Sequence, residues 1–260
     1  MLQVNRVKAI LKKGGISVGS WMSMGHESIA EIMSAAGFDW IVIDLEHSVI
    51  DIGKLHSLII AIESNGSVPL ARLTSNDSSL AKRVMDAGAY GLIIPMVNSA
   101  DDARLAVASI KYPPYGRRSV GIARAHGYGP GFDDYVKIAN DESILIIQIE
   151  HIEGVRNIEE ILSVEGIDGL LIGPYDLSGS LGVPGELNHP KVEEAKRVVL
   201  EAANKRNIAA GIHVVYPSID EFKKCLEEGY RFIAFGADIL FLGESCRASV
   251  KDIRNLLRKA

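Results

Sequence analysis

Short apolar runs alternate with longer amphipathic segments along the whole chain. The apolar runs are rich in Ile, Val and Leu, which is typical of strands that are buried on both faces of a parallel sheet. They predict strands at 16–21, 40–44, 68–73, 91–97, 144–150, 169–173, 209–215 and 232–236.

The segments between these strands carry apolar residues at helical spacing, as in 27–36, 79–87, 192–205 and 219–228. Several end at a glycine that suits a helix C-cap. Alternating strands and helices over 260 residues predict an α/β fold, a (β/α)₈ TIM barrel, as a single domain over residues 1–260. An open doubly wound sheet is the alternative. No G-x-G-x-x-G follows a strand, which disfavours its dinucleotide-binding form.

The composition excludes several other classes of protein. A net charge of −5 disfavours nucleic acid or an anionic membrane as the main partner. The N-terminal residues lack the apolar region of a signal peptide, and no apolar run is long enough to span a bilayer, so we expect a cytoplasmic protein. Cys225 and Cys246 lack metal-site spacing and are expected to be free thiols.

One long irregular stretch, 112–130, separates the fourth predicted strand and its helix from a short helix near 133–139. It contains three arginines, a histidine and several glycines. Loops of this length in a compact domain are usually functional. We therefore expect an excursion over one end of the barrel that contributes contacts to the substrate.

Polar residues collect where the predicted strands end, which is the face of a barrel that carries its chemistry. Four strands contribute to this set. Its members are Asp44, Glu46, His47, Arg72, Gln148, Glu150 and Asp176. This clustering predicts a catalytic rim.

Glu150 and Asp176 are the predicted metal ligands. Carboxylate oxygens suit Mg²⁺ or Mn²⁺, with the other positions left to water and substrate. The alternative is structural: Asp176 could cap a turn, and Glu150 could pair with Arg72.

His47 beside Asp44 suggests acid/base chemistry, because imidazole titrates near neutrality and a carboxylate fixes its tautomer. A structural histidine is the alternative. His151 and His213 are candidates for residues that lie behind the site. Arg72 could either neutralise a structural carboxylate or hold a keto or enolate oxygen. No lysine ends a strand, which disfavours a Schiff-base enzyme.

Five motifs follow D-L-E-H in a fixed order: V-P-L-A-R-L, G-L-I-I-P-M-V, K-Y-P-P-Y-G-R-R, Q-I-E and I-G-P-Y-D-L-S-G-S-L-G. From about residue 19 to residue 241 the chain resembles the HpcH/HpaI family of class II pyruvate aldolases. That family includes 2,4-dihydroxyhept-2-ene-1,7-dioate aldolase and 2-dehydro-3-deoxyglucarate aldolase.

The resemblance implies a barrel of the phosphoenolpyruvate/pyruvate type. It also implies reversible cleavage of a 4-hydroxy-2-oxo acid to pyruvate and an aldehyde through a metal-stabilised pyruvate enolate. The implied cofactor is a divalent metal, Mg²⁺, Mn²⁺ or Co²⁺, with no organic cofactor. No nucleic acid or membrane is implied as a partner.

The resemblance also implies residue roles. Glu150 and Asp176 hold the metal, Arg72 stabilises the enolate, and His47 transfers a proton together with Asp44. Members assemble as hexamers, trimers of dimers, in which the last helix is swapped between subunits and the residue matching Asp86 reaches a neighbour's site.

The substrate is expected to contact Gln148, Gly173, Pro174 and Tyr175, with Glu46 behind the metal site. Tyr175 stands where many family members have a small Ala or Ser, so the resemblance does not identify the aldehyde part of the substrate.

Two other functions compete with this prediction. A citrate-lyase-type enzyme acting on an acyl-CoA shares the barrel and the carboxylates, but no adenine or pantetheine platform is visible. A non-catalytic barrel that serves as a scaffold is disfavoured because the site residues are complete.

Overall fold

The computed structural model describes residues 4–259, so residues 1–3 and 260 of the predicted domain lie outside the described residues. Within this range eight parallel strands close into a barrel in chain order. They are β1 (Ser17–Met22), β2 (Trp40–Asp44), β3 (Val68–Arg72), β4 (Gly91–Ile94), β5 (Ile144–Ile149), β6 (Gly169–Ile172), β7 (Ala209–Val214) and β8 (Phe232–Ala237). The predicted barrel and its strands are confirmed, with small shifts at the strand ends. The pairing of β1 with β8 excludes an open sheet.

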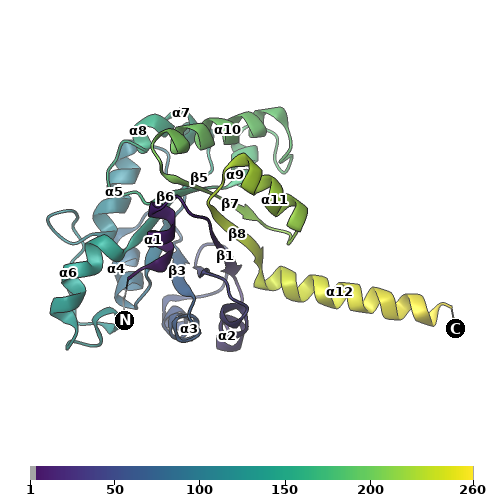
Figure 1. Ribbon diagram of the computed structural model, residues 1–260, viewed down its shortest axis with the longest axis horizontal. Helices are drawn as coiled ribbons and strands as arrows, with labels where there is room; N and C mark the ends of the chain where they lie inside the picture. Colours follow the sequence, from purple (N-terminus) through teal and green to yellow (C-terminus); the bar gives the residue numbers. More distant parts are fainter. Residues whose placement is uncertain (1–3, 260) are drawn as a thin grey trace.

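Helices surround the strands (Figure 1). Their bounds are α1 (Arg6–Lys12), α2 (Glu27–Ala35), α3 (Ile52–Ser64), α4 (Ser78–Asp86), α5 (Ala100–Ile110), η1 (Arg124–His126), α6 (Phe132–Glu142), α7 (Ile152–Arg156), α8 (Ile158–Ile161), α9 (Pro174–Ser180), α10 (Pro190–Lys205), α11 (Ile219–Glu228) and α12 (Asp238–Leu257). The predicted helices are confirmed as α2, α4, α10 and α11, and the short helix near 133–139 as α6. None of the helices within residues 4–259 combines the length and hydropathy that crossing a membrane requires.

The barrel interior is closed near the N-terminal ends of the strands. The ring of Trp40 stacks on that of Phe232, with centroids 4.1 Å apart. Gly19 makes room for this stack, because a Cβ at that position would lie 2.0 Å from the Trp40 ring. Val7 and Leu11 of α1 pack against the same cluster. Among residues 4–259, this packing leaves the C-terminal ends of the strands as the entry for a substrate.

The segment 112–130 lies at the N-terminal end of the barrel. It leads from α5 to β5, and a helix-to-strand connection in such a barrel runs at that end. Arg124 pairs with Glu63 at the end of α3, and Arg118 pairs with Asp86 at the end of α4. The predicted excursion is present, but it covers the end opposite the catalytic rim of its own chain.

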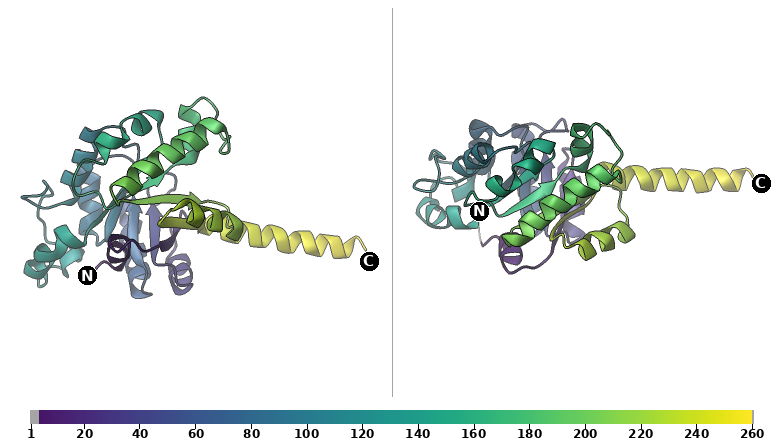
Figure 2. Two further views of the ribbon diagram at one scale, coloured as in Figure 1. Left: turned by 45° about the horizontal axis from the view of Figure 1, so that its top comes forward. Right: turned by 90° about the horizontal axis from the view of Figure 1, so that it is seen from above.

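The last helix, α12, leaves the body of the molecule (Figures 1 and 2). It follows β8 directly, and the carboxylate of Asp238 at its first position accepts hydrogen bonds from the backbone N–H groups of Ser23 and Met24. Beyond this junction Leu242, Val250 and Ile253 are exposed apolar side chains. A helix of this kind is expected to pack against another surface.

Candidate active site

An ion pair between Asp44 and Arg72 forms the centre of the catalytic rim. Asp44 ends β2 and Arg72 ends β3, and the two residues are direct neighbours in the strand register. Arg72 Nε donates to Asp44 Oδ1 at 2.9 Å and Arg72 Nη2 donates to Oδ2 at 2.7 Å. This bidentate geometry fixes the plane of the guanidinium.

The pair stays ionised although both side chains are buried. Burial by itself would raise the pKa of Asp44, but the hydrogen bonds and charge of Arg72 hold this pKa below its ordinary value. Burial opposes the charge on Arg72 too, and Asp44 with Glu46 keeps the Arg72 pKa above its ordinary value. Arg72 Nη1 also lies 3.1 Å from Glu46 Oε2, and the guanidinium lies 5.0 Å from the centre of the Trp21 ring.

The sequence prediction paired Asp44 with His47, and the structure joins different side chains. Asp44 Oδ1 accepts hydrogen bonds from the backbone N–H groups of Glu46 and His47, at 3.0 and 3.3 Å. The imidazole of His47 is 67% exposed, and its Nε2 lies 3.9 Å from Glu46 Oε2. Because Arg72 occupies the oxygens of Asp44, Glu46 is the carboxylate beside the His47 ring.

Glu150 is a buried carboxylate directly after β5. Its Oε1 accepts a hydrogen bond from the Met96 backbone N–H at 2.8 Å, and its Oε2 accepts one from Gln148 Nε2. Burial raises the pKa of Glu150 to about 7, and the nearby carboxylates Glu46 and Asp176 add to this effect. Gly173 is required next to it, since a Cβ there would lie 2.7 Å from Glu150 Oε2.

Asp176 lies in the first turn of α9, which begins at Pro174 directly after β6 and Gly173. Among residues 4–259, no three His, Cys, Asp or Glu side chains are grouped as a metal-binding cluster. Two carboxylates with open positions for water and substrate suit a hard cation such as Mg²⁺. The raised pKa of the buried Glu150 fits this assignment, because a divalent cation would compensate its charge.

A cavity of about 360 Å³ opens at this rim. Of the predicted site residues, all line it except Glu46, Glu150 and Asp86. Glu150 lies behind Gln148 through their hydrogen bond, and Glu46 lies behind Arg72. The polar strand ends of β2, β3, β5 and β6 therefore surround a single cavity.

Asp86 lies elsewhere in the molecule. It ends α4 just before β4 begins, and its Oδ1 accepts a hydrogen bond from Arg118 Nη2 at 2.6 Å. This position is near the N-terminal ends of the strands, so Asp86 does not reach the cavity of its own chain. Its predicted role in a neighbouring subunit stays a prediction.

Trp21 from β1 lines the cavity and escaped the sequence analysis, and His213 from β7, which was expected only behind the site, lines it as well. Their rings stack with centroids 5.0 Å apart, and His213 Nε2 lies 2.9 Å from the Gly236 carbonyl oxygen. Burial lowers the pKa of His213 to about 4, so its ring is neutral near pH 7. The predicted catalytic and binding residues were chosen from the polar residues at strand ends, whereas these two residues lie within strands. An aromatic ring and an imidazole inside otherwise small or aliphatic strands were the available signal.

Comparisons with known proteins agree with the geometry. A family model described as HpcH/HpaI aldolase/citrate lyase matches residues 17–243. A 2-keto-3-deoxy-L-rhamnonate aldolase from Escherichia coli O17:K52:H18 (strain UMN026 / ExPEC) is 39% identical over 246 residues, which cover 94% of this chain and 91% of the relative.

Two crystal structures of related proteins superpose closely on this chain. An HpcH/HpaI aldolase/citrate lyase family protein from Burkholderia cenocepacia J2315 has a TM-score of 0.92 and 35% identity, covering 96% of this chain and 99% of that one. An HpcH/HpaI aldolase from Desulfitobacterium hafniense DCB-2 has a TM-score of 0.89 and 31% identity, covering 95% and 96%.

Proposed function

Because the chain belongs to the HpcH/HpaI aldolase/citrate lyase family and is a carbon–carbon lyase of the aldolase type, we propose that it reversibly cleaves a 4-hydroxy-2-oxo acid to pyruvate and an aldehyde. The single observation that carries this proposal is the buried Arg72 guanidinium. Asp44 and Glu46 hold it in place, and it lines the cavity at the catalytic rim.

Arg72 suits the central problem of this reaction. Cleaving the bond between C3 and C4 leaves an electron pair on the pyruvate fragment, which becomes an enolate. A guanidinium fixed before the reaction starts stabilises negative charge on the enolate oxygen at no reorganisation cost. Trp21 and the bidentate Asp44 contact restrict the guanidinium to one orientation.

The metal ligands in this proposal are Glu150 and Asp176. A divalent cation, Mg²⁺, Mn²⁺ or Co²⁺, supplies a Lewis acid that draws charge from the keto acid when it is bound. Hydrogen bonds from the Gln148 side chain and the Met96 backbone N–H orient the Glu150 carboxylate. Hydrogen bonds of this kind orient a metal ligand and tune its basicity.

His47 is the proposed proton carrier. Cleavage requires loss of the proton from the 4-hydroxyl group, and the reverse reaction returns it. The His47 imidazole lines the cavity, and an imidazole can accept a proton as a general base. Glu46, 3.9 Å from Nε2, is the carboxylate that can orient the ring.

Tyr175 lies on the cavity wall next to Asp176 and is half exposed. We propose that its ring contacts the aldehyde portion of the substrate, together with Pro174. The name of the relative from Escherichia coli makes 2-keto-3-deoxy-L-rhamnonate the first substrate to test.

We also propose that the enzyme is a homohexamer, a trimer of dimers that exchanges α12 between subunits. The exposed apolar side chains along α12 support a second copy of the chain as its partner. Asp86 lies away from its own cavity and is held by Arg118, and we propose that in such an assembly it reaches a neighbour's site.

The test is pyruvate release from a panel of 4-hydroxy-2-oxo acids, measured first with EDTA and then with Mg²⁺, Mn²⁺ or Co²⁺ added back. We expect chelation to abolish turnover and one of the three metals to restore it. Turnover that survives complete chelation would exclude the metal-dependent reaction. A parallel assay with acyl-CoA thioesters covers the citrate-lyase alternative, and cleavage in that assay alone would replace the proposal.

A further inference from the structure

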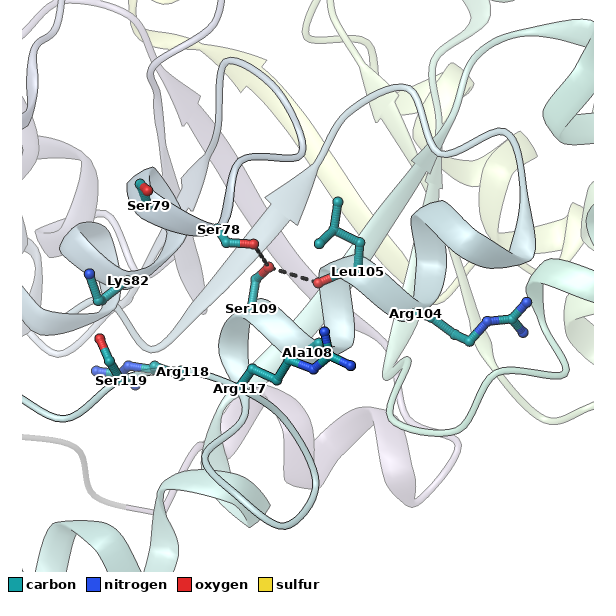
Figure 3. A pocket seen from close by; sticks show the side chains of 10 residues that line it. All are labelled: Ser78, Ser79, Lys82, Arg104, Leu105, Ala108, Ser109, Arg117, Arg118 and Ser119. Carbon is teal, nitrogen blue, oxygen red and sulfur yellow. Dashed lines mark hydrogen bonds between the residues drawn. The ribbon is translucent and has the colours of Figure 1, made fainter.

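A second cavity lies outside the barrel, between α4, α5 and the segment 117–119 (Figure 3). Its volume is about 520 Å³, and it shares no lining residue with the cavity at the catalytic rim. It uses part of the long segment 112–130, for which the proposed reaction within one chain has no role. Within one chain this cavity is therefore separate from the proposed aldolase site.

The walls of this cavity are strongly cationic. Lys82, Arg104, Arg117 and Arg118 line it, and no aspartate or glutamate does. Arg104 pairs with Asp101 at 2.8 Å, and Arg118 pairs with Asp86 at 2.6 Å. Among residues 4–259, neither Lys82 nor Arg117 has an ion-pair partner. The cavity thus presents two uncompensated positive charges on a chain whose net charge is −5.

Arg118 forms a rigid part of the wall. Its side chain is 0% exposed, it donates to the Tyr135 hydroxyl at 2.9 Å, and it lies 4.7 Å from the centre of the Tyr112 ring. Its Nε is buried and has no hydrogen-bond partner among the described residues. A buried donor without an acceptor is costly, and nothing within the described residues compensates the Arg118 Nε.

Serine hydroxyl groups complete the wall (Figure 3). Ser78 and Ser109 share a hydrogen bond of 2.7 Å, and the Ser109 hydroxyl also donates to the Leu105 carbonyl oxygen. The hydroxyls of Ser79 and Ser119 make no hydrogen bond within the part of the chain that the structure describes. These two hydroxyls are available as donors to a ligand.

We propose that this cavity binds the phosphate group of a small phosphorylated metabolite. A phosphate monoester carries a charge of about −1.5 to −2 at pH 7 and three strong acceptor oxygens. The two uncompensated cations match that charge, and the arginine and serine donors match the acceptors. The cavity volume leaves space for the organic part of an ester beside the phosphate group.

The test is isothermal titration calorimetry of the full-length enzyme with inorganic phosphate and with glycerol 3-phosphate, at constant ionic strength set with chloride. We expect saturable binding of both, with the ester at least as tight as the free ion. Lys82→Ala and Arg117→Ala should each weaken binding about tenfold, because each loses a charge-assisted contact. The matched control is Arg83→Ala, which removes the same charge from the exposed side of α4 and should stay within twofold.

Three outcomes would overturn the proposal. The first is the absence of saturable binding, or equal weakening by the Lys82, Arg117 and Arg83 variants, since either result leaves only general charge attraction. The second is loss of phosphate binding in Arg72→Ala, which would place the ion in the catalytic cavity. The third is an altered oligomeric state of Arg117→Ala in sedimentation without phosphate, which would make this cavity an interface between copies of the chain.

Discussion

Two buried arginine–aspartate pairs show how differently the same contact is used in this molecule. Arg72 with Asp44 and Arg118 with Asp86 each have a guanidinium donating to a carboxylate and lying over an aromatic ring. The Arg72 side chain is 10% exposed and lines the cavity at the catalytic rim, whereas the Arg118 side chain is 0% exposed and is enclosed by Tyr112 and Tyr135.

The difference lies in what surrounds each pair. Around Arg72 there are more carboxylates than one guanidinium can neutralise. Besides Asp44, Glu46 and Glu150 lie close enough to raise the pKa of Arg72. Around Arg118 the only carboxylate among its electrostatic partners in the described chain is Asp86. Excess negative charge beside an open cavity is expected at a cation-binding catalytic site. The balanced Arg118–Asp86 pair, packed against two tyrosine rings, instead holds part of the wall of the second cavity in place.

The largest expected effect is on turnover in Arg72→Ala. Removing a fixed donor to the enolate oxygen should lower kcat by about 10³-fold, as for a lost oxyanion donor. Pyruvate release measures this loss, and Arg83→Ala is the control, with unchanged turnover. A variant that keeps a tenth of wild-type kcat would show that Arg72 is a structural cation like Arg118.

Arg118→Ala should mainly affect stability. It leaves Asp86 without its partner in a largely buried site, and we expect the free energy of unfolding to fall by about 3 kcal/mol. Urea denaturation measures the change. Arg104→Ala breaks the exposed pair with Asp101 and is the matched control, with a loss below about 1 kcal/mol. Equal losses in both variants would contradict the structural role of the sealed pair.

The excess carboxylates around Arg72 predict a pH dependence that the Arg118 pair lacks. The pKa of Glu150 is raised from its ordinary 4.5 to about 7, so the folded metal-free protein holds this proton more tightly than the unfolded chain does. The resulting stabilisation is complete below about pH 4.5 and is lost as the pH rises through about 7.

Relative to Glu150→Gln, the metal-free wild type should therefore lose on the order of 2 kcal/mol between pH 5 and pH 8. Denaturation in EDTA across this range measures the difference, and adding Mg²⁺ or Mn²⁺ should restore the wild type most at high pH. Parallel pH profiles for the two proteins would show that the pKa of Glu150 is not raised in the folded protein.

The strands and the rim could be predicted because both depend on local patterns. An apolar run such as 144–150 has few alternatives to a buried strand, and the barrel topology then places Glu150 and Asp44 at one end. The partner of Asp44 could not be read in the same way. His47 is near in sequence, but Arg72 is the register neighbour of Asp44, and register is a property of the closed sheet.

The sequence by itself determined the alternation of strands and helices, the residues at the strand ends and the motifs of the family, because each depends on residues that are neighbours along the chain. The tertiary structure decided three further points. It paired Asp44 with Arg72, placed Asp86 and the segment 112–130 at the end opposite the cavity, and brought Trp21 and His213 together beside Arg72. These contacts join segments far apart in the sequence, so only closure of the barrel specifies them.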